Sequence, residues 1–437
     1  MSTRDEGHVH DLVGIGIGPF NLGLACLADP LPLDAVFLDA ADGFDWHPGM
    51  MLEDATVQVP FLADLVTMAD PTSRFSFLAH LKETGRLYSF YIRESFYPLR
   101  REYADYCRWA ASMLDSLRWG HRVTRVEHDG AAYVVTAETA ADTRRVRGRH
   151  LVLGVGTVPS VPDAVAGLDG PVLHSSDYLH RRDDLRRSRS ITVVGSGQSA
   201  AEIYLDLLEG IHDGGYHLTW LTRSPRFFPM EYTKLTLEMT SPEWVDHFHA
   251  LPAEQRDRQN RAQRHLHKGI SGELVDAIYD TLYRKRSVAP VPTTLATSTA
   301  LTGARWDGSA YRLDLRHEEL GTEFGLETEG LVLATGYRAH VPGFLEPVRD
   351  RLRFDARGRY DVARDFTIDL ADREVFVQNA EEHTHGLTAP DLGMGAHRNS
   401  RILAQVLGRE VYPVERRIAF QEFGVPSGAL VAEEAAR

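Results

Sequence analysis

Two glycine-rich turns, far apart in the chain, most constrain how it can fold. The first, "LVGIGIGPFNLGLA", begins at Leu12, and the second, "ITVVGSGQSAAEI", begins at Ile191. In each, an apolar run typical of a buried parallel strand precedes glycines and a helical pattern. Such a turn lets the backbone approach a ligand, and the helix start offers free N–H groups and a positive dipole end to a pyrophosphate. The pair predicts two dinucleotide-binding units in one chain.

The residues after each turn indicate different nucleotides. The strand "LDAVFLDA" follows the first turn and ends at Asp39, which is placed to accept hydrogen bonds from a ribose 2′-OH. The strand after the second turn, "YHLTWLTRSPRF", instead brings Arg223, with Arg226 just beyond it. Arginine binds a 2′-phosphate as a bidentate pair, whereas an acid would repel it. We therefore expect NADPH rather than NADH; turns without a ligand and merely solvated arginines are the alternatives.

The rest of the pattern predicts an α/β fold with two Rossmann-like dinucleotide-binding domains, one inserted in the other. Each half closes with an alternating segment typical of hairpin strands, "AAYVVTAETA" or "YRLDLRHEEL", and then with an apolar strand and a small-residue turn. Between them lies a stretch with helical spacing and no strand signal. We expect a first dinucleotide-binding domain at 1–165 and 330–405, an NADPH-binding domain at 166–225 and 291–329, and a small helical substrate domain formed by 226–290 and 406–437.

Composition excludes several classes of protein. The 437 residues carry a net charge of −14, which argues against nucleic-acid binding. No apolar run reaches the roughly 18 residues of a membrane helix, and the start "MSTRDEGHVHD" lacks a basic n-region, so we expect neither a membrane segment nor a signal peptide. The two cysteines, Cys26 and Cys107, exclude a disulfide framework and fit a cytoplasmic protein. We predict no metal site, because no ligand spacing is found among the four histidines of the insert, His247, His249, His265 and His267.

Two nucleotide domains indicate a flavin that receives hydride from NADPH, because the flavin carries the redox chemistry and the protein aligns it. Without a CxxC motif, a disulfide reductase is not expected. Six segments in this order resemble the flavin-dependent N-hydroxylating monooxygenases of siderophore biosynthesis, which act on lysine, ornithine or aliphatic diamines. They are "GIGIGPFNLGLA", "WHPGM", "ADPTSRFSFLAHL", "GSGQSAAE", "LATGY" and "HGLTAPDLGMGAHRNSRIL".

This resemblance covers nearly the whole chain and implies FAD, NADPH, O₂ and a homo-oligomer, either a tetramer or a dimer. NADPH would reduce the flavin, and a C4a-hydroperoxyflavin would transfer oxygen to a neutral primary amine, so no side chain is assigned as a catalytic acid or base. By matched position, FAD would contact Gly14, Gly16, Gly18, Pro19, Asp39, Trp46, His47, Pro48, Met51 and Gln58. NADPH would contact Gly195, Gly197, Gln198, Ser199 and Arg223, and Tyr337 would lie near the domain hinge.

The substrate positions depart from the family pattern. The amino-acid hydroxylases that this chain resembles typically have "FLKDL", whose lysine pairs with the substrate carboxylate, where this chain has "FLADL" with Ala63. Leu237 of "LTLE" replaces the asparagine of "FVNE", with Glu238 retained, and Gly393 replaces a serine. Burying a carboxylate without a cation is costly, so these departures favour a diamine, cadaverine or putrescine.

Two points about the substrate stay open in the sequence. An L-lysine N6-monooxygenase is the alternative function, if Lys234 or Lys268 replaces the missing lysine. A diamine has a second ammonium group, and its candidate partners are Glu231, Glu238 and Asp391.

Other classes are distinguished by specific features. Baeyer–Villiger and flavin-containing monooxygenases share two glycine turns, but their expected linker signature, F-x-G-x-x-x-H-x-x-x-[WY], is not found. A reductase would oxidise NADPH without consuming O₂. A flavin-binding sensor would need no second turn and no Arg223.

Overall fold

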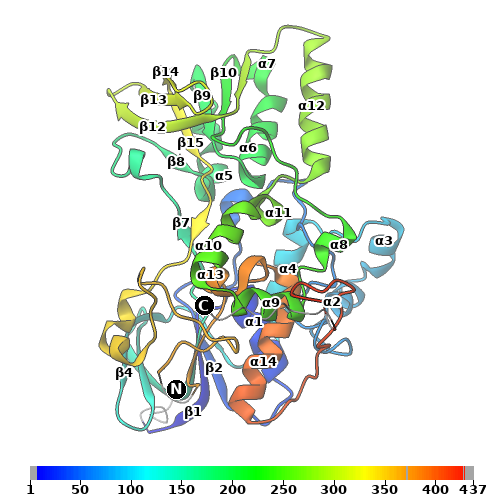
Figure 1. Ribbon diagram of the computed structural model, residues 1–437, viewed down its shortest axis with the longest axis vertical. Helices are drawn as coiled ribbons and strands as arrows, with labels where there is room; N and C mark the ends of the chain where they lie inside the picture. Colours follow the sequence, from blue (N-terminus) through cyan, green and yellow to red (C-terminus); the bar gives the residue numbers. More distant parts are fainter. Residues whose placement is uncertain (1–6, 371–372, 427, 429–437) are drawn as a thin grey trace, which may run out of the picture.

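The computed structural model describes residues 7–370, 373–426 and 428, and two parallel sheets organise it (Figure 1). The first sheet has the parallel order β3-β2-β1-β6-β17. A hairpin of β4 and β5 adds antiparallel strands along the N-terminal half of β6. The strands of this sheet are β1 (Val9–Ile15), β2 (Ala35–Leu38), β3 (Leu117–Arg118), β4 (Arg122–His128), β5 (Tyr133–Glu138), β6 (Thr143–Leu153) and β17 (Val375–Val377).

The second sheet has the parallel order β11-β10-β9-β15-β8, and a three-stranded antiparallel sheet of β12, β13 and β14 accompanies it. Because β15 pairs with β8 and β9, residues 330–333 lie in the second sheet, whereas the predicted boundary at 330 assigned them to the first domain. The strands are β8 (Leu173–His174), β9 (Ser190–Val194), β10 (His217–Leu221), β11 (Thr293–Ala296), β12 (Thr299–Trp306), β13 (Tyr311–His317), β14 (Thr322–Thr328) and β15 (Gly330–Leu333).

The chain passes twice between the sheets, which lie at opposite ends of the long axis (Figure 1). The two passages pair as the short antiparallel strands β7 (Val158–Pro159) and β16 (Tyr337–Arg338). The second unit is therefore inserted in the first, as the sequence predicts.

Helices cover both sheets. In the first core, α1 (Pro19–Ala28), α4 (Arg100–Ser112) and α14 (Gly395–Leu407) bury residues such as Leu22, Tyr106 and Ile402 together. In the second, α6 (Gln198–Glu209) buries Ile203 and Leu207. The remaining helices near these cores are α2 (Phe77–Glu83), α3 (Leu87–Ile92), α5 (Tyr178–Leu185) and α7 (Ile211–Gly214).

The predicted helical insert contains helices from Lys234 onward, but its last helix belongs elsewhere. Helix α12 (Gly272–Arg286) buries Ile278 in the same core as α6, and it links the parallel neighbours β10 and β11 as a crossover helix. The other helices here are α8 (Lys234–Leu237), α9 (Pro242–Ala250), α10 (Ala253–Ala262) and α11 (Arg264–Lys268), with α13 (Glu382–His385) close to α9 and α10. Part of the predicted contribution of 406–437 lies outside the described residues. Within the described part of the chain, no helix is both long and apolar enough to cross a membrane.

Candidate functional site

A large cavity, about 1940 Å³ in volume, runs between the two sheets. Pockets for one small molecule have volumes of about 300–1,000 Å³, so this cavity has room for more than one large ligand. Its wall includes both glycine turns, the loop after Asp45, the connector strand β16 and the segment before α14. The cavity therefore brings together the two turns that the sequence singles out.

Asn21, three residues after Gly18, holds the first turn through side-chain hydrogen bonds. Gly16, with φ of +88°, packs so tightly that a Cβ there would lie 2.4 Å from the carbonyl oxygen of Gly154. The Asn21 amide donates to the Gly16 carbonyl at 2.7 Å, and Gln378 donates to the Asn21 side-chain oxygen at 2.7 Å. Pro19 opens α1, where its missing N–H costs no hydrogen bond. This explains the "GPFN" form of the turn.

Two residues predicted to hold the FAD diphosphate or ribose have other contacts. Gly14 lies inside β1, before the turn, and a Cβ there would be 2.1 Å from the Phe37 ring. The Asp39 carboxylate accepts from the backbone N–H groups of Ile17 at 2.6 Å and Ala41 at 2.8 Å, so it fixes the turn. Neither residue lines the cavity, whereas Gly18 and Pro19 do. The prediction for Gly14 is thus corrected to a packing role.

The "WHPGM" loop packs directly against the second unit. A Cβ on Gly49 would lie 1.8 Å from the Ser176 carbonyl oxygen. Trp46, His47 and Pro48 line the cavity, and Met50 lines it in place of Met51. The short helical turn Pro48–Met50 accounts for this one-residue difference, because it brings Met50 to the wall.

The wall beside the "WHPGM" loop carries a neutral histidine and an unpartnered amide, which suit an uncharged heterocycle. The His47 ring lies 5.8 Å from the Tyr337 ring, and desolvation together with the charge of Arg100 lowers the pKa of His47 to about 4. His47 is therefore neutral at pH 7. The buried Gln58 Nε2 has no hydrogen-bond partner among the described residues. Because buried amides nearly always have a partner, this donor fits the edge of a bound ring, and a flavin fits the wall.

A buried ion pair joins the two units beside this wall. Arg100 donates two hydrogen bonds to Glu202, at 2.8 and 3.1 Å, and a third to the Met50 carbonyl at 2.7 Å. Both charged side chains are largely buried. Glu202 belongs to the quoted segment "GSGQSAAE", but nothing in the sequence indicates its distant partner.

The second turn repeats the geometry of the first. A Cβ on Gly195 would lie 2.2 Å from the Ala334 carbonyl oxygen, and Gly197 is the residue before α6. Gln198 is occupied within the protein, since it donates to Glu202 at 3.0 Å and accepts from the Ser271 N–H at 2.8 Å. All of the predicted NADPH contacts line the cavity, namely Gly195, Gly197, Gln198, Ser199 and Arg223.

Arg223 has a cationic neighbour that the sequence analysis did not identify. Arg264 also lines the cavity, and its pKa is lowered by burial and by the nearby charge of Arg223. Two guanidinium groups at one place repel each other unless an anion lies between them, so the pair suits a phosphate group.

Two departures from the family pattern adjoin one acid of the cavity wall. A Cβ on Gly393 would lie 3.6 Å from the Ala63 Cβ and 2.9 Å from Asp391 Oδ1. A side chain at 393 would therefore collide with the carboxylate of Asp391, which lines the cavity. Asp391 Oδ1 accepts from the Met394 N–H at 3.2 Å, and burial raises the pKa of Asp391.

Of the other predicted substrate residues, some line the cavity and some do not. Leu237 lines the cavity, whereas Ala63 and Gly393 lie behind its wall. Glu238 does not line it either: its carboxylate accepts the backbone N–H groups of Phe420 and Gln421, at 3.0 and 3.1 Å, and so holds the C-terminal segment. The expectation that Glu238 faces the substrate is therefore corrected.

Neither lysine suggested as a replacement is placed to bind a carboxylate in the cavity. Lys268 lines the cavity, but its Nζ contacts both carboxylate oxygens of Glu382, at 2.6 and 2.7 Å. Desolvation opposes ionisation of Glu382, but hydrogen bonds and charge from His267 and Lys268 prevail and lower its pKa to about 2. Lys234 is exposed and does not line the cavity.

A buried arginine supports the loop that carries Asp391. Arg398 Nε lies 3.0 Å from Glu381 Oε1, and Arg398 donates to the Ala389 carbonyl at 2.7 Å. Its guanidinium also lies over the Phe20 ring, 4.6 Å from the centroid, so it contacts the first glycine turn as well. One sequence gives no signal that distinguishes such a buried arginine from a solvated one.

The two sheets and the shared cavity are those of a flavoprotein with paired dinucleotide-binding domains, and comparisons identify the family. Residues 8–339 match the family described as L-lysine 6-monooxygenase/L-ornithine 5-monooxygenase. The chain is 49% identical over 421 residues to a putrescine N-hydroxylase of Shewanella oneidensis, across 95% of this chain and 84% of that protein.

Solved structures agree. The FAD-bound crystal structure of DfoA, the desferrioxamine-pathway cadaverine monooxygenase of Erwinia amylovora, matches with a TM-score of 0.95 and 51% identity, across 97% of this chain and 100% of that one. An ornithine N-hydroxylase of Kutzneria, with reduced FAD, NADP⁺ and L-ornithine, matches with a TM-score of 0.84 and 30% identity, across 92% and 99%.

The chain belongs to the L-lysine 6-monooxygenase/L-ornithine 5-monooxygenase family. The predicted fold, with two Rossmann-like domains, and the predicted enzyme class, an N-hydroxylating flavin monooxygenase, are both confirmed. The sensor and reductase alternatives are set aside on the same findings.

Proposed function

We propose that this enzyme uses FAD, NADPH and O₂ to hydroxylate one primary amine of an aliphatic diamine, cadaverine or putrescine, for hydroxamate siderophore biosynthesis. Its family membership and the names of its relatives support the reaction. The choice of substrate rests on one observation: Asp391 lines the cavity beside Ala63 and Gly393, where the family pattern has a lysine and a serine.

In this proposal, FAD lies along the first turn with its ring against the loop after Asp45. Gly18 would bring its backbone N–H group to the diphosphate beside Pro19, which has none and opens α1, and Asp39 would hold the turn behind it through its bonds to Ile17 and Ala41. Trp46, His47 and Gln58 would border the ring. When bound and reduced, the flavin supplies O₂ activation and transfer of one oxygen atom to the amine.

NADPH would lie along the second turn. Gly195, Gly197 and Ser199 would hold its diphosphate at the start of α6, and Arg223 with Arg264 would bind the 2′-phosphate. Tyr337, on β16, would border the nicotinamide side of the cavity.

The chain's own residues would then orient the diamine. The Asp391 carboxylate would hold the distal ammonium, and its buried position makes that contact stronger than it would be in water. The reacting amine must be neutral, although a free alkylamine has a pKa of about 10.4. Leu237 adds apolar surface to the cavity, and desolvation there would lower the pKa of the reacting amine.

L-lysine is the competing substrate within the same family. Its carboxylate would have to be buried near Asp391, with Lys268 already bound to Glu382. Hydroxylamine formation per NADPH, measured with cadaverine, putrescine, L-lysine and L-ornithine, tests the choice. Coupled turnover of the diamines alone is expected. Efficient coupling on L-lysine with inert diamines would reject the proposal.

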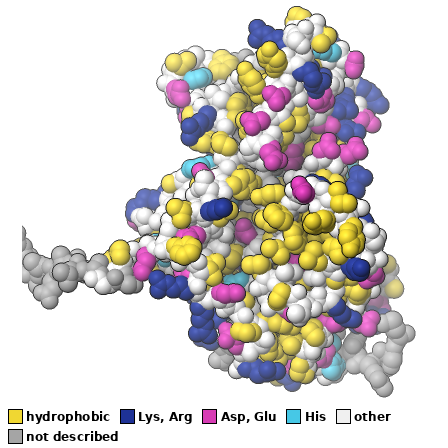
Figure 2. All heavy atoms as spheres, turned by 90° about the vertical axis from the view of Figure 1, so that its right-hand side faces the viewer, with side chains coloured by type: hydrophobic (Ala, Val, Ile, Leu, Met, Phe, Trp, Pro, Cys, Tyr) yellow, Lys and Arg dark blue, Asp and Glu magenta, His cyan; other side chains and the backbone are white. Residues whose placement is uncertain are grey.

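A homo-oligomer and a cytoplasmic location complete the proposal. The side of the molecule that carries α3 has many exposed apolar side chains (Figure 2), among them Tyr88, Tyr91 and Ile92, each more than 70% exposed. Such a surface suits a second copy of the chain, as a dimer or tetramer. Light scattering on the FAD-loaded enzyme tests this, and a monomer at all concentrations would reject it.

Cys26 and Cys107 are free and buried, which fits a reducing compartment; cell fractionation tests the location.

A further inference from the structure

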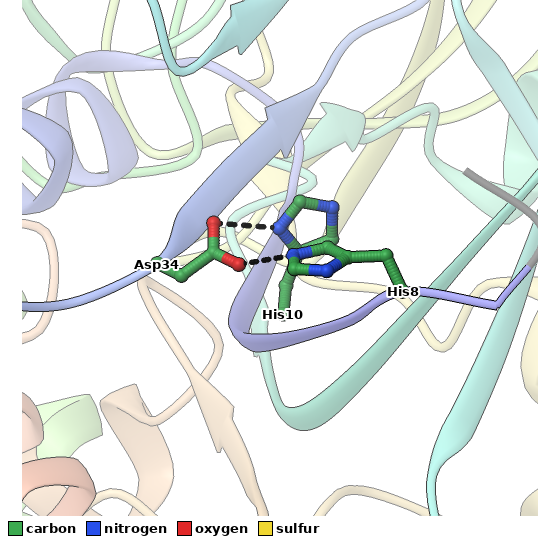
Figure 3. Close-up of side chains that lie close together, drawn as sticks. All are labelled: His8, His10 and Asp34. Carbon is green, nitrogen blue, oxygen red and sulfur yellow. Dashed lines mark hydrogen bonds and ion pairs between the residues drawn. The ribbon is translucent and has the colours of Figure 1, made fainter. Parts of the chain in front are cut away.

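Three side chains far from the cavity converge at the start of the first sheet. His8 lies just before β1, His10 lies within it, and Asp34 lies just before β2. His8 Nε2 approaches one oxygen of Asp34 at 2.5 Å, and His10 Nδ1 approaches the other at 2.9 Å. Figure 3 shows the carboxylate facing both imidazole rings.

Local structure fixes this arrangement. His8 and His10 are two residues apart on an extended strand, so their side chains lie on the same face. Their rings meet edge to face with centroids 4.7 Å apart. The Asp34 backbone is held from both sides, because its carbonyl accepts from the Asp11 N–H at 2.9 Å and its N–H donates to Asp11 Oδ2 at 3.1 Å. The carboxylate is therefore presented to the histidines by a rigid frame.

The ligand set matches one class of cation. The three ligand atoms lie within 4.8 Å of one another, close enough to surround a single ion. Two imidazole nitrogens and one carboxylate suit Zn²⁺ and its neighbours Co²⁺ and Ni²⁺, whereas Mg²⁺ and Ca²⁺ prefer oxygen ligands. Asp11 binds Arg149 at 2.7 Å, so the remaining coordination positions would be filled by water. The group is partly open, with His8 52% and His10 17% exposed, which gives an ion a path in.

We propose that His8, His10 and Asp34 form a binding site for a divalent transition-metal ion of the Zn²⁺ type. The ion would replace the protons that now lie between the imidazoles and the carboxylate. It would join the start of β1 to the segment entering β2, and so stabilise the N-terminal ends of these two strands. The site is structural rather than catalytic, because β1 separates it from the first glycine turn by roughly 20 Å at about 3.3 Å per residue.

The test uses the FAD-loaded full chain and Zn²⁺ as the probe. Calorimetric titration of the wild type is compared with His8→Ala/His10→Ala and Asp34→Asn, with His180→Ala as the control, since His180 is an exposed histidine on α5. One equivalent of Zn²⁺ is expected to bind to wild type and to the control. Loss of ligands is expected to weaken binding at least about 100-fold.

A second measurement keeps the test decisive if one variant folds poorly. Zn²⁺ is expected to raise the melting temperature of wild type and the control by about 2 °C or more, but not that of Asp34→Asn, and Mg²⁺ is expected to do neither. Activity without added metal stays the same in all of these variants. No stoichiometric binding to wild type, or equally tight binding to the variants, would show that the group is only a pair of His–Asp hydrogen bonds.

Discussion

Replacing Asp391 with asparagine separates substrate recognition from folding. Asparagine has nearly the same shape, and its side-chain oxygen can accept the Met394 N–H as Asp391 Oδ1 does at 3.2 Å. The variant therefore keeps the local cap and loses only the negative charge. We expect it to bind FAD and NADPH as the wild type does.

The size of the effect follows from the burial of this contact. A hydrogen bond to a charged group contributes about 1.5–3 kcal/mol, and each 1.4 kcal/mol corresponds to a factor of about 10. Loss of the Asp391 charge should therefore lower kcat/KM for cadaverine by roughly 10- to 100-fold. Pentylamine lacks the distal ammonium, so its kcat/KM should stay the same.

Steady-state hydroxylamine formation on the two amines is the assay. The wild type is expected to prefer cadaverine over pentylamine, and Asp391→Asn should lose that preference. An equal fall on both amines would mean that Asp391 acts through the loop alone. An unchanged preference would mean that another group holds the distal ammonium.

The same substitution has a predicted effect on stability. Burial raises the pKa of Asp391 above its usual 3.8, so the ionised carboxylate is less favourable in the folded chain than in the unfolded one. This cost is present at neutral pH and disappears as the pH falls below 3.8. In the absence of diamine, Asp391→Asn should therefore unfold at higher urea concentration than the wild type at pH 7, with the difference closing toward pH 4. A difference that does not change with pH would contradict this reasoning.

Four further variants test the frame of the cavity and its contact with the 2′-phosphate. Arg100→Ala leaves Glu202 buried without its partner, and urea unfolding should show a loss of about 3 kcal/mol, whereas Arg100→Met with Glu202→Met should lose less. Gly49→Ala places a Cβ 1.8 Å from the Ser176 carbonyl oxygen, and the purified variant should melt at lower temperature and retain less FAD. Arg223→Ala should raise KM for NADPH about 10- to 100-fold and leave KM for NADH unchanged. Equal effects on both would contradict the proposed contact between Arg223 and the 2′-phosphate.

The sequence predicted those features that local chemistry determines. Both glycine turns needed only nearby residues, since a strand, small residues and a helix start occur within about twenty positions of each other. The placement of Arg223 followed from strand length. The substitutions at Ala63 and Gly393 were visible against a family pattern, but their proximity to each other and to Asp391 is a product of the fold.

What the sequence missed depends on long-range packing. Helix α12 has the same periodicity as its neighbours, and only the burial of Ile278 assigns it to the second core. Glu238 was retained from the family pattern, yet its carboxylate binds the backbone near Phe420, over 180 residues away in the sequence. Gly14 resembles a turn residue in the sequence, whereas in the structure it leaves space for the Phe37 ring to pack against β1. None of these partners has a sequence signal of its own.

A crystal structure of the FAD- and NADP⁺-bound enzyme with cadaverine is the most direct test of the central claim, which is that Asp391 binds the distal ammonium of the diamine. We expect one ammonium within about 3.2 Å of an Asp391 oxygen, with the other amine directed toward the flavin. A distal ammonium that reaches only bulk water, or L-lysine bound with its carboxylate on a basic side chain, would contradict it.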